Sequence, residues 1–279
     1  MPAIGFVNGT FMPLEHATVS VEDRGYQFGD GVYEVIRTYR GAPFQVEAHL
    51  ARLERSAAAI GLPMPYPNRE WTRLVMEGIR RAGFAESKVY IQLTRGVAPR
   101  DHAFPAECRP TAVMTIRELR PLAPAVYDAG VEAVTFEDLR WGRCDIKSVN
   151  LLANVLARHR AKEAGVFETI FIREGAVTEG SVSNVMIVTA GRVVTAQEGV
   201  HILSGVTRSL VLDLAHAAGV PVDERAATVE ELHGADEVFL CGTTVEVLPV
   251  VRVDGRMVGT GKPGPVTGTL CERFKRVVA

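Results

Sequence analysis

The class of fold follows from residues 32–61, which spell VYEVIRTYRGAPFQVEAHLARLERSAAAIG. Residues 32–39 alternate with the period of a strand, which places Tyr33 and Val35 on the same face as Arg37 and Tyr39. A turn at residues 40–41 leads into a second strand, PFQV. From residue 47 the period becomes helical, and the apolar stripe of this predicted helix is Leu50, Leu53, Ala57 and Ile60. The segment therefore predicts a fold that mixes strands and helices.

The rest of the chain continues this mixture. A hairpin is expected at FVNGTF, residues 6–11, because Asn-Gly suits a tight turn. Further strands are predicted at 89–95, 111–118, 131–137, 167–172 and 184–189, and around the loop in EVFLCGTTVEVLPVV. Further helices are predicted at 68–82, with Asn68 as its cap, and at 150–164, 206–218 and 265–277. Because strands and helices do not alternate strictly, we expect an α/β fold of mixed α+β type rather than a doubly wound parallel sheet.

A proline-rich segment divides the chain into two predicted domains. The sequence LRPLAP, residues 119–124, is expected to be an extended linker, because each proline disfavours helix around it. It separates a smaller N-terminal domain, residues 1–118, from a larger C-terminal domain, residues 125–279.

Composition excludes several classes of function. The formal net charge is -2 with 47% hydrophobic residues, so we expect a globular protein that binds neither nucleic acid nor a membrane surface. The N-terminus lacks the basic and apolar regions of a signal peptide, and apolar runs are shorter than the roughly 20 residues of a membrane span. Four scattered cysteines make a reducing cytoplasm the expected location, and the seven histidines show no metal-ligand spacing.

One lysine has unusual surroundings. The chain has five lysines: Lys88, Lys147, Lys162, Lys262 and Lys275. The neighbours of Lys147 are largely apolar: Trp141, Cys144, Ile146, Val149, Leu151 and Leu152. Such a lysine either extends its amine to water or is buried for a purpose, and burial lowers an amine pKa enough to favour Schiff-base chemistry.

Other polar positions have a functional and an ordinary interpretation. SGVTR at 204–208 leads into a helix and GTT at 242–244 interrupts a strand pair; each could bind a phosphate, or be an ordinary helix start and an ordinary turn. Glu179 lies in a polar island between strands and could be a solvated loop carboxylate. Arg52 could be a surface helix residue. Arg100 and His102 could clamp a carboxylate or be solvated.

Taken together, these segments resemble the fold type IV aminotransferases, which depend on pyridoxal 5'-phosphate (PLP). The resemblance covers almost the whole chain: EDRGYQFGDGVYEVIR (22–37), the helix with His49 and Arg52, RCDIKSVNLLANVLA (143–157), TEGSVSNV (178–185), ILSGVTR (202–208) and EVFLCGTT (237–244). Within the family, RGVAPRDHAFP (95–105) is similar to the branch that acts on D-amino acids. The branch that acts on branched-chain L-amino acids has glycine at the position of Val35 and lacks the Arg-x-His pair. The CGTT loop has fewer hydroxyls than its D-specific counterparts.

The resemblance implies a role for each candidate residue. Lys147 carries PLP and moves the proton during the reaction, and Glu179 pairs with the pyridine nitrogen. The phosphate ligands are Arg52, Val206, Thr207, Thr243 and Thr244. Leu203 packs on the cofactor ring. The substrate carboxylate is bound by Tyr33, Arg100 and His102.

The resemblance also implies an activity and a partner. The expected enzyme is a D-amino-acid aminotransferase that converts D-alanine and 2-oxoglutarate into pyruvate and D-glutamate, and it is a homodimer with active sites near the interface. The alternatives are an (R)-selective amine transaminase, a branched-chain L-amino-acid aminotransferase, and a PLP-binding carrier or regulator without turnover.

Overall fold

The structure is a computed structural model that describes residues 3–279 of the protein. The chain forms two compact units. The first contains the chain up to Arg120 together with Ile146–Asn150, and the second contains Pro121–Asp145 and Leu151–Ala279. The chain thus leaves the first unit inside the predicted linker. Residues 146–150 belong to the first unit, whereas the predicted division placed them in the C-terminal domain. The predicted domain division itself stays a prediction.

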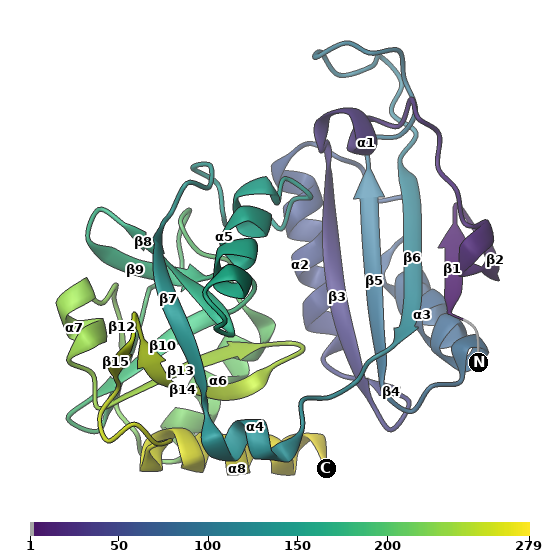
Figure 1. Ribbon diagram of the computed structural model, residues 1–279. Coiled ribbons are helices and arrows are strands. Elements are labelled where there is room, and N and C mark those ends of the chain that lie inside the picture. Colours follow the sequence, from purple (N-terminus) through teal and green to yellow (C-terminus); the bar gives the residue numbers. More distant parts are fainter. Residues whose placement is uncertain (1–2) are drawn as a thin grey trace. The chain divides into compact units, whose positions relative to one another are not determined.

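The first unit is built on one antiparallel sheet with helices on one face (Figure 1). Its strands are β1 (Ile4–Val7), β2 (Thr10–Pro13), β3 (Gly31–Tyr39), β4 (Ala42–Pro43), β5 (Ser87–Thr94) and β6 (Thr111–Glu118). They lie in the order β2-β1-β6-β5-β3-β4, and every neighbouring pair is antiparallel. Its helices are η1 (Leu14–His16), α1 (Arg24–Phe28), α2 (Val46–Ala59) and α3 (Asn68–Ala82).

The predicted apolar stripe of α2 forms part of the core of this unit. Leu50, Leu53 and Ala57 are completely buried, and they join a cluster with side chains of α3 and of the sheet. The predicted hairpin is present as β1 and β2. The predicted cap of α3 is wrong: the helix begins at Asn68 itself, Pro67 precedes it, and the Asn68 amide donates to Glu54 at 2.8 Å.

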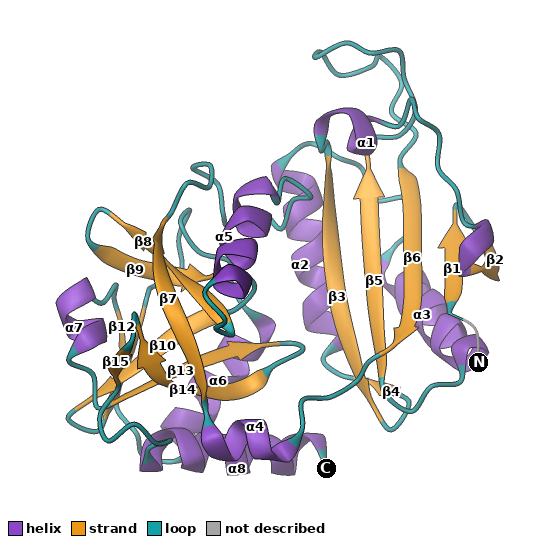
Figure 2. Ribbon diagram, viewed as in Figure 1, coloured by secondary structure: helices purple, strands orange, loops and turns teal. Residues whose placement is uncertain are grey.

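The second unit contains a longer, mixed sheet (Figure 2). Its strands are β7 (Val131–Glu137), β8 (Glu168–Arg173), β9 (Ala176–Gly180), β10 (Asn184–Thr189), β11 (Arg192–Thr195), β12 (Val222–Glu224), β13 (Glu237–Gly242), β14 (Glu246–Val253) and β15 (Arg256–Met257). The order is β12-β11-β10-β13-β14-β7-β8-β9, with β15 beside β14. Three pairs are parallel, β7 with β8, β7 with β14, and β11 with β12. Because β9 also contacts β10, the sheet curves back on itself around its core.

Five helices complete the second unit: α4 (Pro124–Ala129), α5 (Leu152–Glu163), α6 (Val206–Ala217), α7 (Val229–His233) and α8 (Pro265–Val278). α6 and α8 pack against β13, and α8 also packs against β14. No helix within residues 3–279 is long and apolar enough to cross a membrane.

One expected loop is a strand. The polar segment between the strands predicted at 167–172 and 184–189 contains β9, and Val177 to Gly180 are all buried. The alternative interpretation of Glu179 as a solvated loop carboxylate is therefore wrong, since its exposure is only 6%.

Candidate active site

The backbone around Lys147 is fixed against the start of β3, along the edge that β5 does not occupy. Tyr33 N donates to Lys147 O at 2.9 Å, and Val149 N donates to Gly31 O at 3.1 Å. Lys147 N donates to the buried hydroxyl of Ser56 on α2 at 3.2 Å. The segment acts as a short added strand, so the position of the lysine backbone is well determined while its side chain is half-buried.

The Lys147 amine lies over an aromatic surface on the face of the sheet opposite α2. Its Nζ is 4.3 Å from the centre of the Tyr33 ring. Tyr33 stacks on Tyr90 of β5 with ring centres 5.5 Å apart, and the Tyr90 hydroxyl donates to Gln92 at 2.6 Å. Burial raises the pKa of Tyr90 to about 12, so this phenol stays neutral. The surface offers a flat, partly polar place beside the amine.

A buried carboxylate occupies the other face of β3. Glu34 is fully buried and accepts from Arg52 Nε at 2.6 Å, from Arg52 Nη2 at 3.0 Å and from His49 Nδ1 at 2.8 Å. Burial alone would raise the pKa of Glu34, but the charge of Arg52 and the His49 hydrogen bond outweigh it and hold the pKa at about 2. Burial lowers the pKa of His49, and the charges of Arg52 and Lys147 act in the same direction. The cluster therefore pairs the Arg52 cation with an ionised Glu34.

This geometry excludes the surface interpretation of Arg52. The residue is 5% exposed and is not a solvated residue of the helix surface. Its guanidinium grips Glu34 through two nitrogens, and its predicted phosphate contact stays a prediction.

Arg100 and His102 lie at the end of the sheet marked by α1. Arg100 Cζ is 4.5 Å from the centre of the Phe28 ring, and the His102 ring is 5.4 Å from the same ring. Arg24 supports the loop by donating to the backbone carbonyls of Asp101 and of His102. The structure thus brings Arg100 and His102 together on Phe28, whereas Tyr33 packs on Tyr90 and beneath Lys147.

In the second unit, Glu179 is surrounded by donors. Its Oε2 accepts from Asn184 Nδ2 and from the backbone N–H of Leu203, both at 3.1 Å. Its Oε1 accepts from Arg140. Such donors favour the ionised form of a carboxylate. The arrangement suits a ligand that presents a protonated ring nitrogen.

The start of α6 lies beside this carboxylate. Asn184 also donates to Leu203 O at 3.1 Å, and the chain then runs through Gly205, the N-cap, into the helix. No side chain caps the first turn, so its N–H groups are available to an anion. Gly205 is required here, because a Cβ would lie 2.0 Å from Asn184 Oδ1. Of the predicted phosphate ligands on this helix, Thr207 is buried and Val206 is half-buried.

The turn between β13 and β14 completes this part of the second unit. Thr243 and Thr244 are half-buried in it, and Gly242 approaches residues 182–183 in the turn between β9 and β10. Asn184 pairs with Cys241 across β10 and β13. The predicted Glu179, Leu203, α6 and threonine positions are therefore gathered at neighbouring strand ends. A carboxylate for a cationic ring nitrogen and uncapped N–H groups for a phosphate fit a phosphorylated pyridine cofactor.

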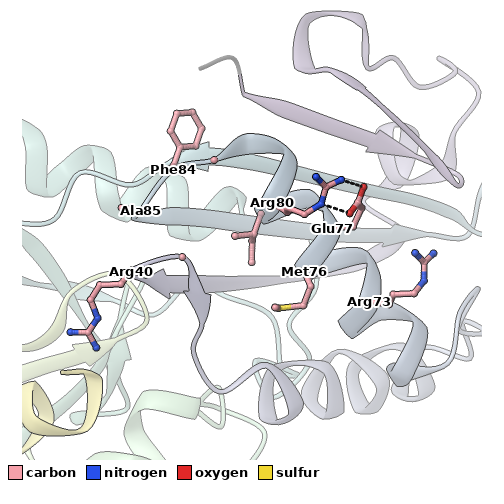
Figure 3. A pocket seen from close by; sticks show the side chains of 10 residues that line it. Arg40, Arg73, Met76, Glu77, Arg80, Phe84 and Ala85 are labelled. Atoms are coloured by element: carbon pink, nitrogen blue, oxygen red, sulfur yellow. Dashed lines mark hydrogen bonds and ion pairs between the residues drawn. The ribbon is translucent and has the colours of Figure 1, made fainter.

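A separate pocket lies on the surface of the first unit (Figure 3). It measures about 810 Å³ and is lined by α3, the turn after β3 and residues 83–85. Arg80 pairs with Glu77 there, and Arg73 pairs with Glu70. The pocket contains none of the predicted site residues, and its ion pairs are those of a solvated helix face.

Several polar residues around the candidate site escaped the sequence analysis. The period of two in β5 could have placed Tyr90 and Gln92 on one face. Glu34 could have been recognised as a charged residue at a core position of β3. No local signal marks Arg140, because its partnership with Glu179 joins residues 39 positions apart.

The chain is similar to known proteins over most of its length. Residues 31–253 match the family described as amino-transferase class IV. The chain is 44% identical over 261 residues to a D-alanine aminotransferase of Bacillus licheniformis, covering 93% of this chain and 92% of that protein. It is 42% identical over 273 residues to one of Staphylococcus haemolyticus, covering 98% and 97%. The crystal structure of the branched-chain aminotransferase from the archaeon Thermoproteus uzoniensis, with norvaline, superposes with a TM-score of 0.88 at 29% identity, over 99% of this chain and 94% of that one.

The chain belongs to the class IV aminotransferase family, and its fold is the mixed α/β fold of those enzymes, as predicted. It is a transaminase.

Proposed function

We propose that this transaminase uses PLP to move amino groups between D-amino acids and 2-oxo acids, with D-alanine and 2-oxoglutarate as the principal pair. The observation that carries the cofactor assignment is the cluster of Glu179, Leu203 and the uncapped start of α6. The choice of D-amino acids is supported by the D-alanine aminotransferases to which the chain is 41–44% identical over most of its length.

The residues of the second unit bind and tune the cofactor in this proposal. Glu179 would accept a hydrogen bond from the protonated pyridine nitrogen, and Leu203 would pack on the ring. Val206 and Thr207 offer helix N–H groups to the phosphate, and Thr243 and Thr244 add hydroxyls. When bound, PLP supplies an electron sink for the electrons of the substrate Cα–H bond.

Residues of the first unit supply the proton chemistry and the substrate contacts. Lys147 would hold the cofactor covalently, and its amine would move the proton of the substrate Cα. Arg52 contributes positive charge toward the phosphate. Arg100, His102 and Tyr33 bind the substrate carboxylate, since an arginine can grip a carboxylate through two parallel hydrogen bonds.

Branched-chain L-amino acids are the alternative substrates, and one structural comparison supports them. The branched-chain aminotransferase of Thermoproteus uzoniensis has a similar structure at 29% identity. The D-alanine aminotransferases share much more sequence over a similar length. Val35 also occupies the half-buried face of β3 that bears Tyr33, where glycine was expected for the branched-chain enzymes.

Donor specificity tests the function directly. The purified protein is loaded with PLP and offered D-alanine, L-leucine or (R)-1-phenylethylamine, and the absorbance of the bound cofactor is followed. We expect D-alanine to change the spectrum fastest and 2-oxoglutarate to restore it, with ping-pong kinetics in the steady state. A fastest response to L-leucine or to the amine identifies the corresponding alternative, and a PLP-bound protein that responds to no donor is a carrier or regulator.

We also propose that the enzyme is a cytoplasmic homodimer. The segments at 21–26 and 97–104 lie side by side, because Arg24 N donates to Gly96 O at 2.9 Å. Both segments expose large apolar side chains: Val21 (72%), Tyr26 (77%), Val97 (60%) and Phe104 (63%). Exposed apolar patches mark interaction sites, and the occupant we propose is a second copy of the chain.

Sedimentation velocity tests the dimer. Val97→Asp should shift the protein toward the monomer, and the matched change Met257→Asp, at an exposed methionine of the second unit, should not. A wild-type protein that sediments as a monomer contradicts the proposal.

A further inference from the structure

Arg140 is placed between two buried carboxylates of the second unit. Its Nε donates to Asp138 Oδ1 and its Nη2 to Asp138 Oδ2, both at 2.8 Å. Its remaining terminal nitrogen, Nη1, donates to Glu179 Oε1. The arginine and aspartate side chains are 6% and 0% exposed, so water contributes little to this bridge.

The guanidinium plane is fixed on every side. The Phe171 ring lies 4.5 Å from Arg140 Cζ, and Arg140 Nη2 also donates to His201 O at 3.1 Å. Asp138 is held in turn by Arg173 at 3.2 Å and accepts from the hydroxyl of Thr178 at 3.1 Å. The direction in which Nη1 points is therefore set by groups other than Glu179.

We propose that Arg140 is a positioning residue for the cofactor: its bridge from Asp138 fixes the Glu179 carboxylate in the orientation that receives the pyridine nitrogen. This inference rests on the proposed function of Glu179. Asn184 and Leu203 hold Oε2, and Arg140 holds Oε1, so the carboxylate is oriented from both ends. A partner oriented in advance saves the cost of ordering it when the ligand binds.

Charges in the network agree with this role. Burial would raise the pKa of Asp138, but the hydrogen bonds from Arg140 and Arg173 and the charge of Arg140 together outweigh it and hold the pKa at about 2. Burial works against the charge of Arg140, yet the hydrogen bond to Asp138 and the charge of Glu179 raise its pKa further. Asp138 and Arg140 are thus both charged at neutral pH.

The test is a double-mutant cycle on PLP affinity. The apoprotein and its variants Arg140→Met, Glu179→Gln and the double variant are titrated with PLP, and the dissociation constant is obtained from the absorbance of the bound cofactor. We expect Arg140→Met to weaken binding about tenfold to a hundredfold, as for a lost charged hydrogen bond. In the Glu179→Gln background the same change should have little further effect, because the carboxylate that Arg140 orients is no longer present.

An exposed arginine of the same segment serves as the control. Arg143→Met removes an arginine that is paired with Asp145. This variant should show no coupling to Glu179→Gln. A merely structural role for Arg140 predicts an equal loss of affinity in both backgrounds, and that result overturns the proposal.

Arg140→Lys separates position from charge and replaces the methionine variant should that one not fold. An ammonium keeps the charge but cannot span Asp138 and Glu179 with a planar fork. We expect Arg140→Lys to bind PLP as weakly as Arg140→Met, and affinity at the wild-type level overturns the proposal. Failure of the wild-type apoprotein to bind PLP would instead refute the proposed function, so the two failures are distinguishable.

Discussion

Lys147 and Glu179, the two predicted partners of the cofactor, are held in opposite ways. The backbone of Lys147 is clamped by β3 and Ser56, while its amine is half-buried over the Tyr33 ring. The carboxylate of Glu179 is buried and bound at both oxygens. Glu179 is therefore held at its carboxylate oxygens, whereas Lys147 is held only at its backbone.

The difference matches the chemistry that each residue performs in the proposed function. An amine that bonds to the cofactor, leaves it and then moves a proton must change position during one turnover. A carboxylate that stabilises a ring cation is most effective when it is oriented beforehand. Changing either residue tests whether this division of work is correct.

The largest effect is expected from Lys147→Ala. Turnover should fall by several orders of magnitude, because the covalent link and the proton transfer are lost together, and proton transfer alone contributes about 10²–10⁴-fold. Borohydride reduction of the wild-type protein should attach the cofactor to a peptide containing Lys147. Lys162→Ala, at an exposed position on α5, should keep full activity. Recovery of the label on another lysine would refute the assignment.

The next largest effect is expected from Glu34, which lies in the buried charged cluster of the first unit. The pKa of Glu34 is about 2 in the folded protein and 4.5 without its partners, so its ionisation stabilises the fold above pH 4.5. This contribution, about 3 kcal/mol, is lost as the pH falls from 4.5 toward 2. Glu34→Gln should therefore make the apoprotein less stable at pH 7 and reduce its further loss of stability on acidification.

Urea unfolding at pH 7 and at pH 3.5 measures both effects. Glu70→Gln is the matched control, because Glu70 pairs with Arg73 on an exposed helix surface and such pairs contribute little. An unchanged unfolding midpoint for Glu34→Gln at pH 7 would show that the cluster is not a source of stability.

Much of the fold was predictable because its signals are local. The period of two in β3, the stripe in α2 and the Asn-Gly turn between β1 and β2 depend only on neighbouring residues. The segment that became β9 was not recognised as a strand, because its polar residues Thr178 and Glu179 are satisfied by partners elsewhere in the unit.

The candidate site was predictable mainly through the family resemblance. Residue patterns alone left Glu179 and Arg52 with ordinary interpretations, and only burial in the folded chain removed these. The supporting residues Glu34 and Arg140 act through partners that are distant in sequence, so no local pattern identified them.

Glu179→Gln tests the role of the buried carboxylate. The amide should still accept a hydrogen bond and keep PLP bound, but it cannot stabilise the protonated pyridine by charge. We expect proton transfer in the half-reaction with D-alanine to slow by up to about two powers of ten. Stopped-flow absorbance measures this step. A glutamine variant that transaminates at the wild-type rate is not compatible with Glu179 as the partner of the ring nitrogen.

The smallest effect is expected at the substrate carboxylate, where Arg100→Leu removes one charged contact. The loss in kcat/KM should be about one to two powers of ten for both D-alanine and 2-oxoglutarate, because both dock the same carboxylate. PLP affinity should not change, and discrimination against L-alanine should weaken. His102→Ala should act in the same direction but less, since a neutral imidazole donates without full charge. (R)-1-phenylethylamine has no carboxylate, so its rate should hardly change in either variant.

Arg109→Leu, in the same loop but exposed and paired with Glu107, provides the control. Intact D-alanine kinetics in Arg100→Leu would exclude this arginine from the substrate site, and a wild-type preference for L-alanine would overturn the stereochemical assignment itself.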